Sequence, residues 1–279
     1  MEYFTLNNGY KMPMAGIGTF MINSADTEIA VESALKSGIR LIDTANAYMN
    51  ESATGRGIKK SGVPREEIFL VSKLWPTVYE KETAVEEMLK RLNTDYVDVL
   101  FLHQPTDNWH AGYKNIEKAI KAGKVRSIGL SNFSEEEIRE AVDIMEIKPQ
   151  IVQVEAHPYY PQTSLKKMLA ETKMGLMAWS PIGHGDKNLI NEPIFSELAA
   201  KYGKSNVQII LRWHVQSGNV VFPGSRNPDH IRENFDIFDF ALTNEEMAKI
   251  AKVDKNTRYY NATPELVASY KTMELKEDL

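Results

Sequence analysis

The stretch VRSIGLSNFSEEEIREAVDIMEIKPQIVQV, residues Val125–Val154, contains a complete strand–helix–strand pattern. It begins and ends with mainly apolar runs, Val125–Leu130 and Ile151–Val154, which do not alternate cleanly between apolar and polar residues, as is typical of strands covered on both faces. Between the runs, a capping box of Ser134 and Glu137 precedes an apolar stripe at helical spacing. Parallel neighbouring strands require such a crossover helix, so this stretch predicts one unit of a parallel α/β fold.

The same unit recurs along the chain. Further apolar runs are Ala15–Ile17, Ile39–Ile42, Phe69–Val71, Val97–Leu102, Leu176–Trp179 and Val220–Phe222. The residues that close successive runs are Asp43, Lys73, His103, Ser131, Glu155 and Trp179, at separations of 30, 30, 28, 24 and 24 residues. About eight units without a linker predict one (β/α)₈ TIM barrel domain over residues 1–279. A doubly wound open sheet is the alternative, but it normally carries a glycine fingerprint after its first strand.

The N-terminal residues add a hairpin to this barrel. Asn8-Gly9 lies between short runs that contain Phe4, Leu6, Tyr10 and Met12, and this pair is a strong signal for a tight turn between two strands.

Composition excludes several classes of protein. The 279 residues carry 33 Lys and Arg against 38 Asp and Glu, a net charge of −5, which argues against a nucleic-acid or anionic-membrane partner. The absence of Cys excludes disulfides, thiolate metal sites and a Cys nucleophile. We see no signal peptide and no apolar run of about 18 residues, so a cytoplasmic location is expected.

Common catalytic motifs are incomplete. Gly16-Ile-Gly18 lacks the third glycine of a dinucleotide fingerprint, and Gly129-Leu-Ser131 lacks the second glycine of a nucleophile elbow. None of the six His forms an HExxH pair, so no metal site is predicted.

The residues at the strand ends are more informative. Active sites of such barrels lie at the C-terminal ends of the strands. Asp43, Lys73 and His103 follow three successive runs, and Tyr48 lies five residues after Asp43. Taken singly, each has an ordinary structural explanation: a helix cap, a packed ring or a satisfied core group. Together they favour a site, because a Lys at the end of a buried strand needs a partner and Asp43 is the natural one.

These residues also carry a resemblance to the aldo-keto reductase family over essentially the whole chain. The matching segments are Gly16–Phe20, Leu41–Tyr48, Lys73–Trp75, Leu102-His103, Gly129–Phe133, Gln153–Tyr159, Ala178–Pro181, Phe222–Ser225 and Glu233–Phe235. The chain looks similar to the prokaryotic members that include the 2,5-diketo-gluconate reductases.

The resemblance implies a catalytic tetrad of Asp43, Tyr48, Lys73 and His103 in an enzyme that reduces aldehydes or ketones with NAD(P)H. Tyr48 would be the general acid, and Lys73, held by Asp43, would lower the pKa of its phenol. His103 would orient the carbonyl and stabilise its developing charge.

The resemblance also implies where the cofactor, NADP(H) with plausible use of NAD(H), would bind. Ser131, Asn132 and Gln153 would hold the carboxamide and Trp179 would stack on the nicotinamide. Ser180, Pro181 and Gly183 would follow the pyrophosphate. The adenosine end would lie at Ser225, Arg226 and Asn234, and further contacts are expected from Gly18, Thr19, His230 and Glu233. Where members that favour NADPH carry Lys and Arg, this chain has Gly224 and His230, so a weakened preference for NADPH is expected.

A small carbonyl substrate would contact Phe20, Trp75 and His103 and pass the segment around Tyr259-Tyr260. Gln104 stands where many relatives have Trp, which favours polar substrates. Two other functions remain open at this point. One is a non-catalytic barrel that binds nicotinamide, and the other is a glycosidase that uses Asp43 and Glu155 as its carboxylate pair. A monomer is expected from the family.

Overall fold

The computed structural model describes residues 1–275; residues 276–279, the end of the predicted domain, lie outside the described residues. Eight parallel strands form one sheet in chain order, and a parallel bridge between Ala15 and Val221 brings its two edges together. The strands are β3 (Ile17–Gly18), β4 (Leu41–Asp43), β5 (Phe69–Leu74), β6 (Val97–Leu102), β7 (Val125–Ser131), β8 (Ile151–Glu155), β9 (Gly175–Trp179) and β10 (Asn219–Val221). The predicted barrel is confirmed, with Ala15 supplying the closing bridge rather than opening the first strand.

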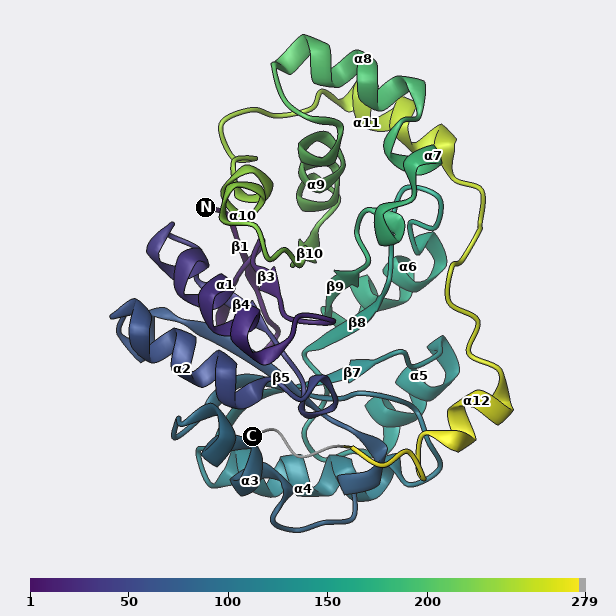
Figure 1. The fold of residues 1–279 in the computed structure, drawn as a ribbon. Helices are drawn as coiled ribbons and strands as arrows, with labels where there is room; N and C mark the ends of the chain where they lie inside the picture. The colour runs from purple at the N-terminus through teal and green to yellow at the C-terminus, as the bar shows by residue number, and fades with distance from the viewer. Residues whose placement is uncertain (276–279) are drawn as a thin grey trace.

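Helices surround this sheet, as Figure 1 shows. They are α1 (Ser24–Lys36), α2 (Glu51–Ser61), α3 (Ala84–Leu92), α4 (Trp109–Lys121), α5 (Glu135–Ile144), α6 (Thr163–Thr172), α7 (Lys187–Ile190), α8 (Pro193–Tyr202), α9 (Asn206–Gln216), α10 (Pro228–Phe235), α11 (Asn244–Ile250) and α12 (Pro264–Ser269). The predicted capping box of Ser134 and Glu137 is present at the start of α5. It begins the helix at this point because it satisfies backbone N–H groups that have no partner within the helix.

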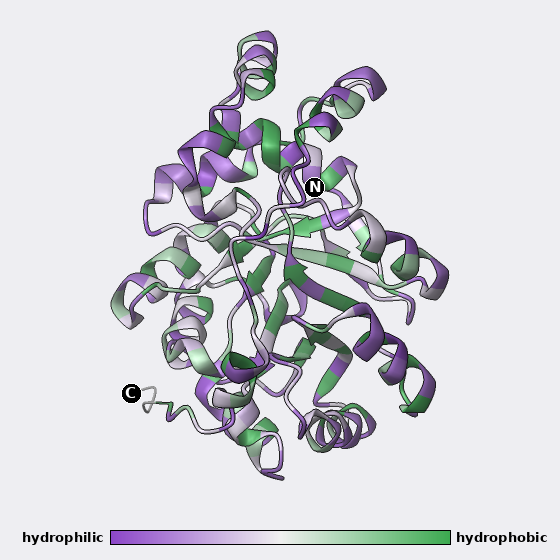
Figure 2. Cartoon of the chain, turned by 90° about the vertical axis from the view of Figure 1, so that its right-hand side faces the viewer, coloured by the Kyte–Doolittle hydropathy of each residue, from purple (hydrophilic) through white to green (hydrophobic). Residues whose placement is uncertain are grey.

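The strands are buried on both faces, which explains why their sequences are mainly apolar rather than alternating. In β6, Val99 and Phe101 belong to the cluster inside the barrel, whereas Leu100 and Leu102 pack in the cluster shared with the helices. Figure 2 shows the mainly hydrophobic strands inside, surrounded by helices in which hydrophilic and hydrophobic residues are mixed. Gly129 of β7 has no side chain because a Cβ there would lie 2.3 Å from the ring of Phe101.

The predicted N-terminal hairpin is confirmed and closes one end of the barrel. Strands β1 (Tyr3–Thr5) and β2 (Lys11–Pro13) pair antiparallel, and Gly9 adopts the left-handed conformation in the turn (φ +94°). Asn8 donates to Arg126 O at the start of β7 (3.1 Å), and Leu6 packs inside the barrel. The hairpin therefore covers the N-terminal ends of the strands and leaves the C-terminal ends for a site.

The last described segment, residues 254–275, follows α11. It passes beside α6 and α5 and contains α12 (Figure 1). Among residues 1–275, no helix has the length and apolar character needed to cross a membrane.

Candidate active site

Three of the four predicted tetrad residues lie on or directly after three adjacent strands. Asp43 ends β4, Lys73 lies within β5, and His103 follows β6 directly. The sequence placed the end of the third strand at Val71, but the ladder with β6 continues to Leu74. Lys73 is therefore held by a strand rather than a loop, which fixes its backbone.

The buried centre of the site is an ion pair between Lys73 and Asp43. Lys73 Nζ lies 2.7 Å from Asp43 Oδ2 and also donates to Thr44 O at 2.9 Å. The other carboxylate oxygen, Asp43 Oδ1, accepts from Gln153 Nε2 at 2.8 Å. The two charged side chains are 0% and 1% exposed. Such a pair is tolerable without water because each charge has additional hydrogen-bond partners.

Tyr48 lies directly above this pair. It belongs to a short 3₁₀ helix, η1 (Asn46–Tyr48), which ends at Met49 in a left-handed conformation (φ 55°). Lys73 Nζ is 4.8 Å from the centre of the Tyr48 ring, and the His103 ring is 5.6 Å away, edge to face. Strained backbone of this kind is more common at functional sites, and here it turns the chain immediately after the phenol.

The electrostatics of the site keep the phenol and the imidazole neutral. Burial, aided by the charge of Asp43, raises the pKa of Tyr48 well above its ordinary value. Burial, aided by the charge of Lys73, lowers the pKa of His103 well below its ordinary value. The shift of Tyr48 is opposite to the one predicted from sequence, because burial of the phenol and the negative charge of Asp43 both disfavour the phenolate. Tyr48 is therefore a protonated donor throughout the neutral range.

A second buried carboxylate, which the sequence did not predict, acts on Lys73. Glu51, at the start of α2, is fully buried and accepts a hydrogen bond from Ser72 Oγ at 2.5 Å. Its other oxygen lies 2.8 Å from Arg91 Nε. Burial lowers the pKa of Lys73, and the charges of Asp43 and Glu51 oppose that shift. The only sequence signal was a charged residue three positions after Tyr48.

The residues expected to hold nicotinamide lie on the next strand ends. Ser131 pairs in register with Gln153, and Glu155 pairs with Trp179, so these side chains follow one another around the barrel. Asn132 donates to His103 O (3.1 Å), and its Oδ1 accepts from Trp179 Nε1 (2.9 Å). Amide and hydroxyl groups beside a half-buried flat ring fit an aromatic ligand that carries a carboxamide, since an amide oxygen takes two hydrogen bonds.

The loops expected to follow the cofactor phosphates have unusual backbone conformations. Ser180, Gly183 and His184 have positive φ (51°, 60° and 54°) directly after β9. On the other side, a Cβ on Gly18 would lie 2.7 Å from Phe222 O, so the ends of β3 and β10 approach closely at a glycine. Thr19 is buried and its hydroxyl contacts Thr44 and Asn50 rather than open space.

The adenosine-end residues are on or beside α10. Arg226 is exposed, and its Nη1 lies 3.6 Å from Asp26 Oδ2 of α1. His230 and Glu233 are exposed on α10, with Asn234 partly buried next to them. Ser225 accepts a hydrogen bond from Asn227 N at 3.1 Å and so shapes the turn into the helix.

Aromatic rings form the wall expected for the substrate. Phe20, 58% exposed, lies 5.0 Å from the Tyr48 ring, and Trp75 lies 4.9 Å from His103. The other neighbour of Trp75 is Tyr270 of the C-terminal segment, also at 4.9 Å. Trp75 Nε1 is buried without a hydrogen-bond partner in the part of the chain that the structure describes.

The arrangement argues against the glycosidase alternative. Asp43 is paired with Lys73 and Gln153, and Glu155 binds backbone N–H groups of Tyr259 and Tyr260. Neither carboxylate is free to act on a sugar, so they do not form the pair that such chemistry needs. In residues 1–275, no group of three or more potential ligands is arranged to hold a metal ion.

A (β/α)₈ barrel with these four side chains at its C-terminal end defines an oxidoreductase, and the chain belongs to the aldo/keto reductase family, whose model matches residues 14–255. It is 41% identical over 273 residues to morphine 6-dehydrogenase of Pseudomonas putida, covering 91% of each chain. It is 42% identical over 258 residues to glyoxal reductase of Bacillus subtilis (strain 168), covering 91% of this chain and 93% of the relative. The crystal structure of MGS-M4, an aldo-keto reductase from a Medee basin deep-sea metagenome library, superposes with a TM-score of 0.89 at 37% identity, over 92% of this chain and 97% of that one.

Proposed function

We propose that this enzyme reduces small aldehydes and ketones to alcohols with NAD(P)H, and that Tyr48 donates the proton. The observation that carries the proposal is the buried Lys73–Asp43 pair beneath the Tyr48 ring, with neutral His103 beside it. A Lys side chain is almost never fully buried unless it is paired, and buried charged groups with shifted pKa values are concentrated at functional sites.

Each side chain has a distinct role. When bound, nicotinamide supplies the hydride that reaches the carbonyl carbon. Tyr48 gives its proton to the carbonyl oxygen, and the ammonium of Lys73 stabilises the phenolate that this step leaves. Asp43 holds Lys73 in place from below. Neutral His103 donates one N–H and so orients the oxygen that becomes negative.

The cofactor would be held at the ends of β7, β8 and β9. Ser131, Asn132 and Gln153 would bind the carboxamide, and Trp179 would pack on the nicotinamide ring. The glycines and positive-φ residues after β9 would let the backbone approach the pyrophosphate closely. The named activities of the relatives, a dehydrogenase of morphine and a reductase of glyoxal, are the two directions of alcohol–carbonyl interconversion and support the same reaction here.

A direct assay tests this function. The enzyme is mixed with NADPH or NADH and a simple aldehyde, and nicotinamide absorbance is followed. We expect it to fall with turnover. Binding of nicotinamide without turnover would favour the non-catalytic alternative, and release of sugar from a glycoside without either cofactor would favour the glycosidase.

Arg226 is expected to recognise the 2′-phosphate of NADPH. Its guanidinium already faces one carboxylate, Asp26, at 3.6 Å, and a phosphate would replace this partner with a stronger one. Arg226→Ala should therefore weaken NADPH binding about tenfold or more, the scale of one lost hydrogen bond to a charged group. NADH binding should stay within about twofold, since NADH lacks that phosphate. Dissociation constants for both cofactors, measured by tryptophan fluorescence, check this.

The matched control is Arg232→Ala. Arg232 is also exposed on α10, but it pairs with Asp229 of the same helix. It should change neither constant. Equal losses for NADPH and NADH in the Arg226 variant would show that the guanidinium does not read the phosphate.

A further inference from the structure

Glu155 is a buried carboxylate that the reaction does not use. It ends β8 and is 1% exposed. Its Oε1 accepts hydrogen bonds from Tyr259 N (2.7 Å) and from His157 Nε2 (3.0 Å), and its Oε2 accepts one from Tyr260 N (3.2 Å). Burial raises the pKa of Glu155, but these hydrogen bonds more than compensate and hold the pKa below its ordinary value. The group is therefore an anion that binds the backbone of the C-terminal segment.

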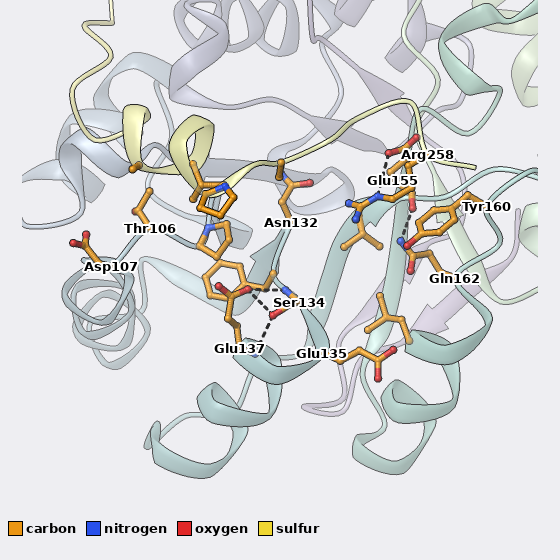
Figure 3. Close-up of a pocket in the computed structure, with 18 of the residues that line it drawn as sticks. Thr106, Asp107, Asn132, Ser134, Glu135, Glu137, Glu155, Tyr160, Gln162 and Arg258 are labelled. Carbon is orange, nitrogen blue, oxygen red and sulfur yellow. Dashed lines mark hydrogen bonds and ion pairs between the residues drawn. The ribbon is translucent and has the colours of Figure 1, made fainter. Parts of the chain in front are cut away.

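That segment has little support between its two ends. Residues 258–271 form one wall of a cavity of about 680 Å³, whose other wall is made by the residues that follow β6, β7 and β8. Figure 3 shows Glu155 and Arg258 at one side of this cavity and Asp107 at the other. At the far side, Lys271 Nζ lies 2.6 Å from Asp107 Oδ1. Because a cavity rather than packed core lies beneath the segment, its position depends on these end contacts.

From Glu155, contacts lead to the tetrad. The residue held at Oε2, Tyr260, shares a hydrogen bond between hydroxyls with Tyr270 at 2.7 Å. Tyr270 packs edge to face on Trp75 (4.9 Å), and Trp75 packs on His103 (4.9 Å). The Tyr260 ring also packs edge to face on the Trp179 ring, with 5.8 Å between the ring centres. The segment thus supplies one side of the aromatic wall beside the carbonyl site.

We propose that Glu155 is a positioning residue for the substrate: its carboxylate fixes the C-terminal segment by two backbone N–H groups and so holds Tyr270 against Trp75. This inference rests on the proposed carbonyl reduction. A carboxylate suits the task because both oxygens accept hydrogen bonds. An amide at the same position would turn an NH₂ group toward one of the two backbone N–H groups.

The first test is Glu155→Gln. KM for a carbonyl large enough to reach the wall, such as 4-nitrobenzaldehyde, should rise about tenfold, the scale of a lost charge-assisted hydrogen bond. The turnover number should change by less than about twofold, because no group that moves a proton is altered. Cofactor affinity should be unchanged. Loss of turnover with unchanged KM would overturn the proposal.

A double-mutant cycle separates positioning from general destabilisation. Tyr270→Ala removes the wall residue itself and should also raise KM. If Glu155 acts through Tyr270, adding Glu155→Gln to this variant should change KM by less than about twofold, because the two residues then act as one unit. If the increases in KM caused by the two single substitutions multiply in the double variant, the proposal is contradicted. The control is Glu246→Gln, which alters another buried carboxylate, one that binds Lys201 and Tyr202 of α8 rather than residues 258–271, and it should leave KM unchanged.

Limited trypsin digestion tests, without an activity assay, whether Glu155 holds the backbone of Tyr259 and Tyr260; we call this contact the clamp. Arg258, with a 44% exposed side chain, is adjacent to the clamped backbone and lies 4.0 Å from Glu155 Oε2. Cleavage after Arg258 should be faster in Glu155→Gln than in the wild type or in Glu246→Gln. Equal cleavage rates would overturn the clamp even if the enzyme reduces carbonyls. If the variant is cleaved faster but the wild type reduces no carbonyl compound, the proposed function and the substrate-positioning role are both overturned. Only the binding of the C-terminal segment by Glu155 would then remain supported.

If Glu155→Gln does not fold, Tyr260→Phe serves in its place. This variant removes only the hydroxyl that binds Tyr270. It should raise KM by about threefold, the scale of one neutral hydrogen bond, with unchanged turnover. An unchanged KM would show that the segment does not position Tyr270.

Discussion

Tyr48→Phe is expected to lower the turnover number for carbonyl reduction by at least about 100-fold, the usual scale for loss of a general acid. The ring remains, so its packing on Phe20 and His103 and the fold should be retained. Cofactor dissociation constants should stay close to those of the wild type. Steady-state kinetics with a simple aldehyde, together with a cofactor titration, measure both quantities.

The control is Tyr96→Phe, which alters a phenol directly before β6 that packs against Arg65 and Arg126 at the opposite end of the barrel. Its turnover should stay within about twofold of the wild type. Near-native turnover in the Tyr48 variant would mean that another group supplies the proton. Because the pKa of Tyr48 is raised, the wild-type reduction rate should also stay level through neutral and mildly alkaline pH.

Lys73→Met should abolish most activity and destabilise the fold. It removes the charge that we propose to stabilise the Tyr48 phenolate, and it leaves Asp43 buried without its cation. Breaking a buried pair on one side costs about 3–5 kcal/mol. Turnover should fall by about 100-fold or more. Urea unfolding and steady-state kinetics measure the two effects.

The pH dependence of the stability lost in Lys73→Met tests whether unpaired Asp43 is the cause. Burial raises the folded-state pKa of Asp43, and without Lys73 nothing charged opposes that shift. A raised carboxyl pKa gives stability that is present below the unfolded-state value and is lost as pH rises through the folded-state value. The variant should therefore lose more stability relative to the wild type at pH 8 than at pH 5. Adding Asp43→Asn should recover part of the loss. An identical pH–rate profile for the Lys73 variant and the wild type would show that Lys73 does not act on the phenol.

Much of the barrel could be predicted because its signals are local. Apolar runs about 24–30 residues apart mark strands covered on both faces, and the Ser134–Glu137 box marks the start of a helix within four residues. The placement of Asp43, Lys73 and His103 at one end follows from the same periodicity, since parallel strands point in one direction. The pairing of Lys73 with Asp43 was accessible because a buried ammonium needs an anion.

The remaining features depend on contacts between distant residues. Gln153 was expected at a carboxamide, and the structure adds its hydrogen bond to Asp43 across 110 positions of the chain. Nothing near Glu155 in the sequence shows that its carboxylate binds backbone more than 100 residues later. The shift of Tyr48 was predicted in the wrong direction because its burial depends on neighbours that no local pattern reveals.

The order of the strands around the barrel separates the residues proposed for proton transfer from those proposed for cofactor binding. Asp43, Lys73 and His103 lie on or directly after β4 to β6, whereas Ser131, Gln153 and Trp179, which we propose to bind nicotinamide, lie on β7 to β9. The proposed substrate wall comes partly from a third source, the segment after α11. Under the proposed function, sequence changes in that segment would alter which carbonyls are accepted, while the proposed proton donor and cofactor-binding residues keep their places. Gln153 donates a hydrogen bond to Asp43 and so connects the proposed cofactor-binding residues to the proposed proton-transfer residues. A substitution of Gln153 that alters cofactor binding is therefore expected to alter proton transfer as well.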